Sequence, residues 1–464
     1  MSASVELPLW LLLLVALFAL AGLLDRLLVP SVRWLLRRRV NRVIEDVNTR
    51  LHLRLQPFKL TRRQVLIDRL VHDPDVMRAL DEAAETTETP REVLAQRALR
   101  YAREIVPAFN AYVYFRIGYR LARLLARTLY RVRVIYPDQR TLAAIPEGAS
   151  VVFVMNHRSN MDYVLLAYLA ANQAALSYAV GEWARIWPLQ QLIRLMGAFF
   201  VRRQSDDPLY RRVLRRYVEM ATEAGVTQAV FPEGGLSRDG ALRPPRLGIL
   251  RYMLDAAARE RGADVVFIPV GVNYDRVLED RTLIGDDSQT TSEDGAKRMI
   301  RATFGFLARQ IVLAGTGQWH RFGYACVVFG TPLSLGDWCR EQARDPASPE
   351  TAEALAEALM ARVADALPVT PVALVSDILL AAGPEGLERD DLARHADERI
   401  ARITDAGGYV HHPRSSRAYL LEVGLRMLLS RHIAEAQGSR IRIVDGERPA
   451  AAYYANALRH WPTA

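Results

Sequence analysis

The stretch VVFVMNHRSNMD, residues 151–162, places a short apolar run directly before a polar turn. An apolar run of this length, rich in valine, is typical of a buried strand. Similar runs recur as VRVIY (132–136), QAVF (228–231), VVFIPV (265–270) and CVVFG (326–330). Helical patterns separate them near residues 161–172, 208–224, 246–261 and 295–315. This alternation predicts an α/β domain with a mostly parallel sheet flanked by helices.

The chain has 464 residues, which is too long for one ordinary core. Half of the residues are hydrophobic and 24% are charged, a composition typical of globular proteins. We expect the α/β domain at residues 132–345, after a helical region at 43–131. A membrane anchor with a basic juxtamembrane segment is expected at 1–42, and a helical carboxy-terminal region at 346–464.

The anchor is predicted from residues 7–24, an uncharged run dominated by leucine, alanine and valine. Eighteen such residues are just enough to cross the hydrocarbon core of a bilayer. The run is followed by Arg26, Arg33, Arg37, Arg38, Arg39 and Arg42. Positive charge on that side predicts that the rest of the chain faces the cytoplasm. The alternative is an amphipathic helix that lies flat in the membrane interface.

A second basic amphipathic segment, AYVYFRIGYRLARLLARTLYR, occupies residues 111–131. Its arginines recur at helical spacing at positions 116, 120, 123 and 127. Such a helix could lie on an anionic membrane. It could equally be an ordinary helix that docks on the core, and the sequence leaves both interpretations open.

The formal net charge of +9 comes almost entirely from arginine, because lysine occurs only at Lys59 and Lys297. Arginine grips phosphate through its planar guanidinium group. Nucleic acid is not an expected partner, since the basic segments are rich in leucine and no recognition motif is present. Cys326 and Cys339 have no metal-ligand spacing, and we expect no metal site.

The turn after the 151–155 strand holds the first candidate chemistry, in His157 and Asp162. In open α/β sheets, sites lie where the strands end. Across such a turn the carboxylate can hold one imidazole nitrogen protonated and leave the other free as a base. This pair could deprotonate an alcohol that attacks a thioester. Taken alone, the spacing is equally compatible with helix capping and core packing.

A second motif, GAFFVRR at residues 197–203, ends in Arg202 and Arg203. Two guanidinium groups after an apolar run suit an anion such as phosphate. The alternative is a solvated pair at the end of a core strand.

The third motif is FPEGGLSRDG, residues 231–240, after another short strand. Gly234 and Gly235 let the backbone approach a ligand closely. Glu233 is a candidate for an acceptor hydroxyl and Arg238 for a phosphate, although such turns are often plain loops. The spacing is not that of a nucleophile elbow, so Ser237 is not assigned as a nucleophile.

The fourth motif is IPVGVNY, residues 268–274, a buried-strand pattern with Pro269 inside it. Because proline cannot donate a ladder hydrogen bond, we expect a strand edge or a bulge near a functional site. A plain core strand is the alternative.

These four motifs, in this order, resemble the blocks of the glycerolipid acyltransferase superfamily, above all the bacterial glycerol-3-phosphate 1-O-acyltransferases. The resembling blocks are NHRSNMD, GAFFVRR, FPEGGLSRDG followed by LRPPRLG, and IPVGVNYDRVLE, all within residues 156–279. A weaker similarity continues into the helical region at VTPVAL, residues 369–374. One departure is Leu236, which stands where the family usually has an arginine.

The resemblance implies that His157 is a general base with Asp162 as its partner. It implies that the substrates are held by Arg202, Arg203, Glu233, Gly234, Gly235, Ser237, Arg238, Arg246 and Pro269. Pro269 would lie by the acyl donor, and Arg243 or Arg246 could supply the charge that Leu236 lacks.

The implied reaction moves a fatty acyl group from acyl-CoA or acyl carrier protein to the sn-1 hydroxyl of glycerol 3-phosphate. The product would be lysophosphatidate, an intermediate of phospholipid biosynthesis. No cofactor, metal or acyl-enzyme is expected. We expect the chain at the cell inner membrane, in contact with phospholipid, with its catalytic domain facing the cytoplasm. Two alternatives remain. One is an acyltransferase acting on dihydroxyacetone phosphate or lysophosphatidate. The other is a non-catalytic protein that binds anionic membranes.

Overall fold

The computed structural model describes residues 56–136, 145–146, 148–170, 175–181, 189–202, 205–259, 264–285 and 321–462. The predicted membrane anchor, the helix expected near 295–315 and Arg203 lie outside these residues. Within the described ranges, no helix combines the length and the apolar character needed to cross a membrane.

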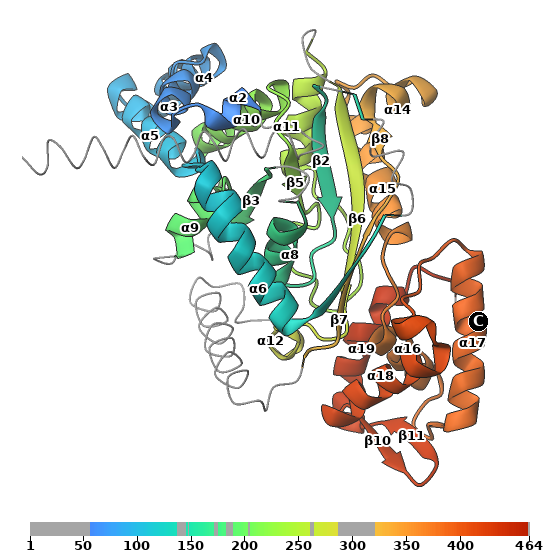
Figure 1. Cartoon of the computed structure of the whole chain (residues 1–464). Helices are drawn as coiled ribbons and strands as arrows, with labels where there is room; N and C mark the ends of the chain where they lie inside the picture. Colours follow the sequence, from blue (N-terminus) through green and yellow to red (C-terminus); the bar gives the residue numbers. More distant parts are fainter. Residues whose placement is uncertain are drawn as a thin grey trace, which may run out of the picture. The chain divides into compact units, whose positions relative to one another are not determined.

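A mostly parallel sheet forms the centre of the α/β domain (Figure 1). Its strands are β1 (Arg131–Ile135), β2 (Ser150–Met155), β3 (Ser177–Gly181), β4 (Phe199–Val201), β5 (Gln228–Val230), β6 (Val265–Tyr274), β7 (Tyr324–Phe329) and β8 (Leu333–Ser334). They are ordered β1-β7-β6-β2-β5-β3-β4, and β8 pairs with β6. Strands β6, β2, β5, β3 and β4 run parallel to one another, whereas β7 and β8 run antiparallel to β6.

Alternation along the central strands divides the core between the two faces of the sheet. Val151, Phe153 and Met155 of β2 belong to one cluster of buried apolar side chains. Val152 and Val154 belong to a second cluster. Successive side chains of a strand point to opposite faces, so an entirely apolar strand requires cover on both sides.

Helices supply that cover (Figure 1). On the first face α6 (Tyr119–Leu129) packs beside α8 (Met161–Ala170). The second face is covered by α10 (Pro208–Glu223), α11 (Gly248–Ala257) and α15 (Pro349–Asp365). The remaining helices of this region are α9 (Leu189–Leu195), α12 (Asp280–Ile284), α14 (Leu335–Glu341) and the π-helical turn η1 (Val113–Gly118).

From residue 56 onward, where the description begins, four helices precede this layer: α2 (Pro57–Leu60), α3 (Arg63–Val71), α4 (Pro74–Thr87) and α5 (Arg91–Ile105). The prolines at 74 and 90 mark helix starts, as their lack of a backbone N–H predicts. Pro74 is the first residue of α4, and the Asp73 carboxylate caps that helix by accepting the N–H of Asp75. The described residues 56–129 are therefore mainly helical.

The carboxy-terminal region, drawn in orange and red in Figure 1, is mainly helical. Its elements are α16 (Pro371–Ala381), α17 (Arg389–Asp405), α18 (Arg417–Ser430), α19 (Arg448–Ala455) and the 3-10 turns η3 (Pro413–Ser415), η4 (Asp445–Glu447) and η5 (Asn456–Leu458). It also holds an antiparallel sheet of β9 (Leu387–Glu388), β10 (Ala434–Gln437) and β11 (Arg440–Ile443), which the helical prediction missed. These strands are too short to give a clear alternation, and β10 and β11 meet at a tight turn where Gly438 has a positive φ.

The five predicted strands are all present, whereas β3, β4 and β8 were not predicted as separate strands. Directly after the β6 region, residues 280–284 form the short helix α12. Its Asp280 is buried and ion-paired, so the charge of this residue reflects a buried contact and not a solvent-exposed loop.

Buried charges join the sheet to the carboxy-terminal region within one compact unit. The carboxylate of Asp275, just after β6, accepts the N–H groups of Tyr324 and Val372. Burial raises the pKa of Asp275 to about 7. Asp280 of α12 pairs with Arg431 at 2.5 Å and accepts the hydroxyl of Tyr454 from α19. These contacts fix the end of β6 against the helices that follow.

Candidate active site

His157 and Asp162 meet across the turn between β2 and α8, at the carboxyl edge of the parallel strands. Nδ1 of His157 lies 2.8 Å from Oδ2 of Asp162, and both side chains are buried. The same oxygen accepts the backbone N–H groups of Arg158 and Ser159. These bonds fix the carboxylate where it can hold a proton on Nδ1 and leave the lone pair on Nε2.

Nε2 of His157 has no hydrogen-bond partner among the described residues, although it is buried. The imidazole packs on the ring of Phe231, with 4.4 Å between the ring centroids. It also meets the ring of Tyr163 edge-on, with 5.2 Å between the centroids. Buried polar atoms are normally satisfied, so an unsatisfied one beside a cavity is a candidate for substrate contact. The geometry is that of an oriented base with its accepting nitrogen available.

Tyr274 completes the arrangement and was not assigned a role from the sequence. Its hydroxyl donates to Oδ1 of Asp162 at 2.5 Å, from the last residue of β6. Burial and the Asp162 carboxylate raise the pKa of Tyr274 well above its usual range, so the hydroxyl stays protonated as a donor. A polar side chain at the end of an apolar strand was the available signal, but its partner lies 112 residues away.

We expect Tyr274→Phe to lower kcat about tenfold or more and to leave KM for both substrates unchanged, because it removes one hydrogen bond to a charged group. The matched control is Tyr130→Phe. Tyr130 is equally buried and packs against Tyr274, but its hydroxyl donates to the carbonyl of Arg276. Steady-state kinetics of the two variants test this. Equal losses in both variants would contradict a specific role for Tyr274.

Two further carboxylates hold the loop around His157. Glu233 accepts the backbone N–H of His157 at 2.9 Å and that of Arg243 at 3.2 Å. Glu279 accepts the hydroxyl of Ser159 at 2.7 Å and the N–H of Asn160. Burial raises the pKa of both carboxyl groups to about 7. Glu233 therefore joins the first and third motifs, and Glu279 is a second residue that sequence reasoning did not single out.

The third motif is held against both the first motif and the carboxy-terminal region. The N–H of Ser237 donates to the carbonyl of His157, and its hydroxyl donates to the carbonyl of Ala241. Gly240 has a positive φ, and a Cβ there would lie 1.8 Å from the carbonyl oxygen of Tyr453. Only glycine allows this approach of α19 to the motif.

Arg158, inside the first motif, is buried and serves the same junction. Its guanidinium donates to the carbonyls of Gly240 at 2.9 Å and Tyr453 at 3.2 Å. The neighbouring Asn156 exchanges two hydrogen bonds with the backbone of Val272 on β6. Arg158 and Asn156 thus both position the turn that carries His157.

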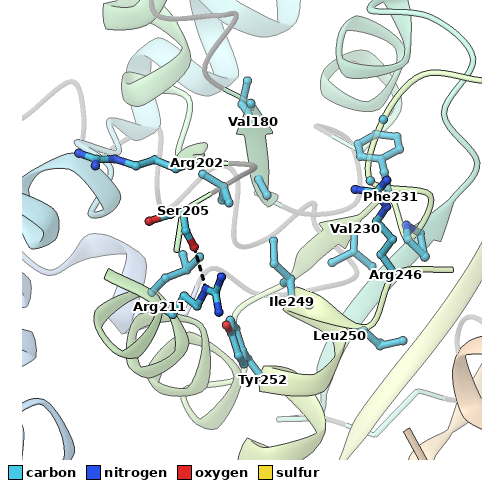
Figure 2. Close-up of a pocket in the computed structure, with 18 of the residues that line it drawn as sticks. Val180, Arg202, Ser205, Arg211, Val230, Phe231, Arg246, Ile249, Leu250 and Tyr252 are labelled. Atoms are coloured by element: carbon cyan, nitrogen blue, oxygen red, sulfur yellow. Dashed lines mark hydrogen bonds between the residues drawn. The ribbon is translucent and has the colours of Figure 1, made fainter. Parts of the chain in front are cut away.

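A cavity of about 700 Å³ opens beside His157, which is one of its lining residues. Phe231 and Arg246 lie on one side of it, and Arg202, Ser205 and Arg211 lie on the other (Figure 2). Apolar side chains line the space between them, namely Val180, Val201, Leu214, Val230, Ile249 and Leu250. The cavity thus offers basic groups at its ends and an apolar stretch between them, which suits an amphiphilic substrate.

The predicted phosphate ligands are placed differently from one another. Arg202 lines the cavity, but its guanidinium makes a bidentate ion pair with Glu104 at 2.9 and 2.7 Å. Arg238 is not among the residues that line the cavity. Arg246 does line it, together with His157, Gly234 and Gly235. Its side chain packs against Gly234, where an added Cβ would come within 2.8 Å of it.

Pro269 lies inside β6 and is not among the residues that line the cavity. It faces Val154 of β2 in the parallel register. On the other side of β6, pairing with β8 involves residues 266–267 and pairing with β7 begins at 270. The proline therefore occupies the point in a central strand where one antiparallel partner replaces the other, and it makes no part of either antiparallel pairing.

No group of three or more histidine, cysteine, aspartate or glutamate residues in the described ranges is arranged to hold a metal ion. Cys326 and Cys339 are free and buried.

The chain is similar to known acyltransferases in sequence. Residues 138–273 match the model of the Acyltransferase family, and residues 311–462 match the glycerol-3-phosphate acyltransferase C-terminal region. A glycerol-3-phosphate acyltransferase from Aeromonas hydrophila is 31% identical over 72% of this chain and 42% of its own length. Those from Shewanella woodyi and Pseudomonas putida are 28% and 29% identical, each over 86% of this chain.

The chain spans about half the length of the curated relatives it matches, for example 50% of the Shewanella woodyi protein. Among solved structures, a 1-acyl-sn-glycerophosphate acyltransferase from Thermotoga maritima aligns with a TM-score of 0.31 and 14% identity, over 65% of this chain and 96% of its own. The two family models account for both the sheet with its motifs and the helical region that follows it. The chain therefore belongs to the glycerol-3-phosphate acyltransferase family.

Proposed function

We propose that this chain transfers a fatty acyl group from a thioester to the sn-1 hydroxyl of glycerol 3-phosphate. The observation that carries the proposal is the buried His157–Asp162 pair, whose free Nε2 lies at a cavity lined by Arg246. The relatives named glycerol-3-phosphate acyltransferase support this choice of acceptor.

In the proposed mechanism, Nε2 of His157 accepts the proton of the acceptor hydroxyl while the oxygen attacks the thioester carbonyl. The tetrahedral intermediate then collapses and breaks the carbon–sulfur bond, and the thiol leaves with the proton that His157 returns. In this mechanism backbone N–H groups near His157 stabilise the oxyanion. The acyl group passes directly to the acceptor, without an acyl-enzyme, and no cofactor takes part.

Arg246 is the proposed ligand of the acceptor phosphate. Leu236, which occupies the position of the family's usual arginine, is half-buried and packs against the apolar core. Arg246 approaches the same turn from the other side, through its packing on Gly234. A guanidinium group there would hold the phosphate beside the catalytic base.

We expect Arg246→Gln to raise KM for glycerol 3-phosphate about tenfold or more, since it removes one charge-assisted contact. The KM for the acyl donor should stay within about twofold, because uniform binding of the donor is untouched. Arg238→Gln is the comparison, because Arg238 lies in the same loop but does not line the cavity. A larger increase in KM for Arg238→Gln than for Arg246→Gln would mean that Arg238, and not Arg246, binds the phosphate.

The activity itself is tested with the purified full chain. Thiol release is measured with acyl-CoA and with acyl carrier protein, each against glycerol 3-phosphate, dihydroxyacetone phosphate and lysophosphatidate. We expect turnover with glycerol 3-phosphate. Comparing thiol release from acyl-CoA with that from acyl carrier protein identifies which of the two is the acyl donor. Turnover with dihydroxyacetone phosphate or lysophosphatidate alone would instead assign one of those acceptors, and Leu236 would be the first residue to examine. Vesicle binding without thiol release would favour the non-catalytic alternative.

We also propose that the chain works at the cytoplasmic face of the cell inner membrane, next to phospholipid. The apolar run at 7–24 and the arginines after it support this location. A fatty acyl donor and a lysophosphatidate product are amphiphilic, so a site beside a bilayer suits both.

A further inference from the structure

The helix α6 exposes an unusual set of side chains. Ile117, Leu121 and Leu124 are 48%, 41% and 64% exposed. They are three of the six large hydrophobic residues that are exposed in the described part of the chain. Their spacing of four and three residues places them in one stripe along η1 and α6.

The buried side of α6 explains why these residues face outward. The helix contacts α8 and the core through Ala122, Ala126 and Leu129, which are 6%, 0% and 1% exposed. An amphipathic helix that merely docks on a core turns its large apolar side chains inward. Here two alanines and one leucine face the core, whereas Leu121 and Leu124 face away from it. Of the two interpretations of this segment, the docking helix accounts for the alanines but leaves the outer leucines unexplained.

A row of arginines borders the apolar stripe. Arg116, Arg120, Arg123 and Arg127 are all exposed, and their spacing of three and four residues aligns them beside the leucines. No aspartate or glutamate occurs between residues 111 and 135. This face therefore has an apolar stripe next to a row of positive charges, and residues 111–135 contain no acidic residue that could balance those charges.

We propose that the face formed by Arg116, Ile117, Arg120, Leu121, Arg123, Leu124 and Arg127 docks on an anionic phospholipid surface. The apolar stripe would enter the interface, and the long arginine side chains would reach the lipid phosphates. A second copy of this chain is a poorer occupant, because it would bring the same four positive charges against these. The proposal goes beyond acyl transfer and does not depend on which acceptor the enzyme uses.

The test places a polarity-sensitive nitrobenzoxadiazole probe on the full chain at Leu124→Cys. Cys326 and Cys339 are buried and free, so labelling is directed to the new cysteine. Emission is recorded with vesicles of phosphatidylcholine alone and of phosphatidylcholine with phosphatidylglycerol. We expect a rise in intensity and a blue shift with the anionic vesicles only, weakened by salt. The readout is local, so attachment through residues 1–42 cannot produce it by itself.

Two comparisons complete the experiment. Val93→Cys on α5 carries the same probe at a residue that is 44% exposed, and it should not respond. Adding Arg120→Gln and Arg123→Gln to the labelled Leu124→Cys chain should lower the ratio of docked to undocked probe about thirtyfold, from the contribution of each arginine near an anionic surface. Leu121→Cys provides a second reporter position if Leu124→Cys folds poorly.

Several results would overturn the proposal. Equal responses at positions 93 and 124 would mean that no specific face docks, and equal responses to both vesicle types would exclude recognition of anionic lipid. A probe at 124 that is already blue-shifted without vesicles would show that protein covers this face. If that shift depended on protein concentration, the cover would be a second copy. Loss of acyl transfer with an intact probe response would count against the proposed enzyme and not against this surface.

Discussion

Replacing His157 by alanine should reduce acyl transfer about a thousandfold, the contribution expected of a well-placed general base. The imidazole is buried, held by Asp162 at 2.8 Å, and presents an unpaired Nε2 beside the cavity. No other described histidine lines that cavity. In the variant the Asp162 carboxylate keeps three donors, the N–H groups of Arg158 and Ser159 and the hydroxyl of Tyr274, so it does not become an unpaired buried charge.

Thiol release by purified His157→Ala measures the effect, and circular dichroism with a thermal scan checks that the variant is folded. Asp162→Asn should cause a comparable loss, because an amide cannot hold Nδ1 protonated in the way that a carboxylate does. His395→Ala, which changes a half-exposed histidine of α17, should leave turnover unchanged. Near-normal turnover by a folded His157→Ala protein would remove the histidine from the mechanism.

The largest expected effect on stability is that of Arg431→Met. This change removes the partner of Asp280 and leaves a buried carboxylate uncompensated. The two side chains are only 10% and 4% exposed, and the guanidinium also donates to the hydroxyl of Tyr454. Breaking such a pair typically lowers the free energy of unfolding by about 3–5 kcal/mol. Urea denaturation followed by tryptophan fluorescence measures the change.

The matched comparison removes both charges. Arg431→Met combined with Asp280→Asn should recover much of the lost free energy of unfolding, because no isolated charge is then buried. A surface control is Arg340→Gln, whose partner Asp337 is largely exposed, and it should change stability by less than about 1 kcal/mol. If Arg431→Met were as mild as Arg340→Gln, the pair would not fasten α12 to α18.

The sequence predicted the mostly parallel sheet and the meeting of His157 with Asp162 because both are encoded locally. The two residues lie five positions apart, and the strands that precede the motifs are mainly apolar. The strands β3, β4 and β8 have only two to five residues, too few to give a distinctive period beside a helix.

Contacts between residues far apart in the chain could not be predicted from the sequence. Tyr274 contacts Asp162, 112 residues away in the sequence, and Glu279 contacts Ser159, 120 residues away. Neither residue type indicates which distant residue it will contact. Arg202 had the right chemistry for phosphate, but the ion pair with Glu104 depends on how α5 packs beside β4. Glu233 was expected at the acceptor hydroxyl, whereas both of its oxygens accept backbone N–H groups. The residue type at these positions indicated what kind of contact the side chain could make, but not which residue it would contact.

The contact of Arg158 and Gly240 with the carbonyl of Tyr453 bears on how this chain can be divided or recombined. The catalytic motifs end at residue 279, yet the turn that carries the base rests on a helix near residue 450. A transplanted catalytic sheet without α19 would leave the guanidinium of Arg158 buried and partly unsatisfied. For protein engineers and for evolution alike, the smallest unit that keeps the turn around His157 in place therefore includes α19 as well as the sheet.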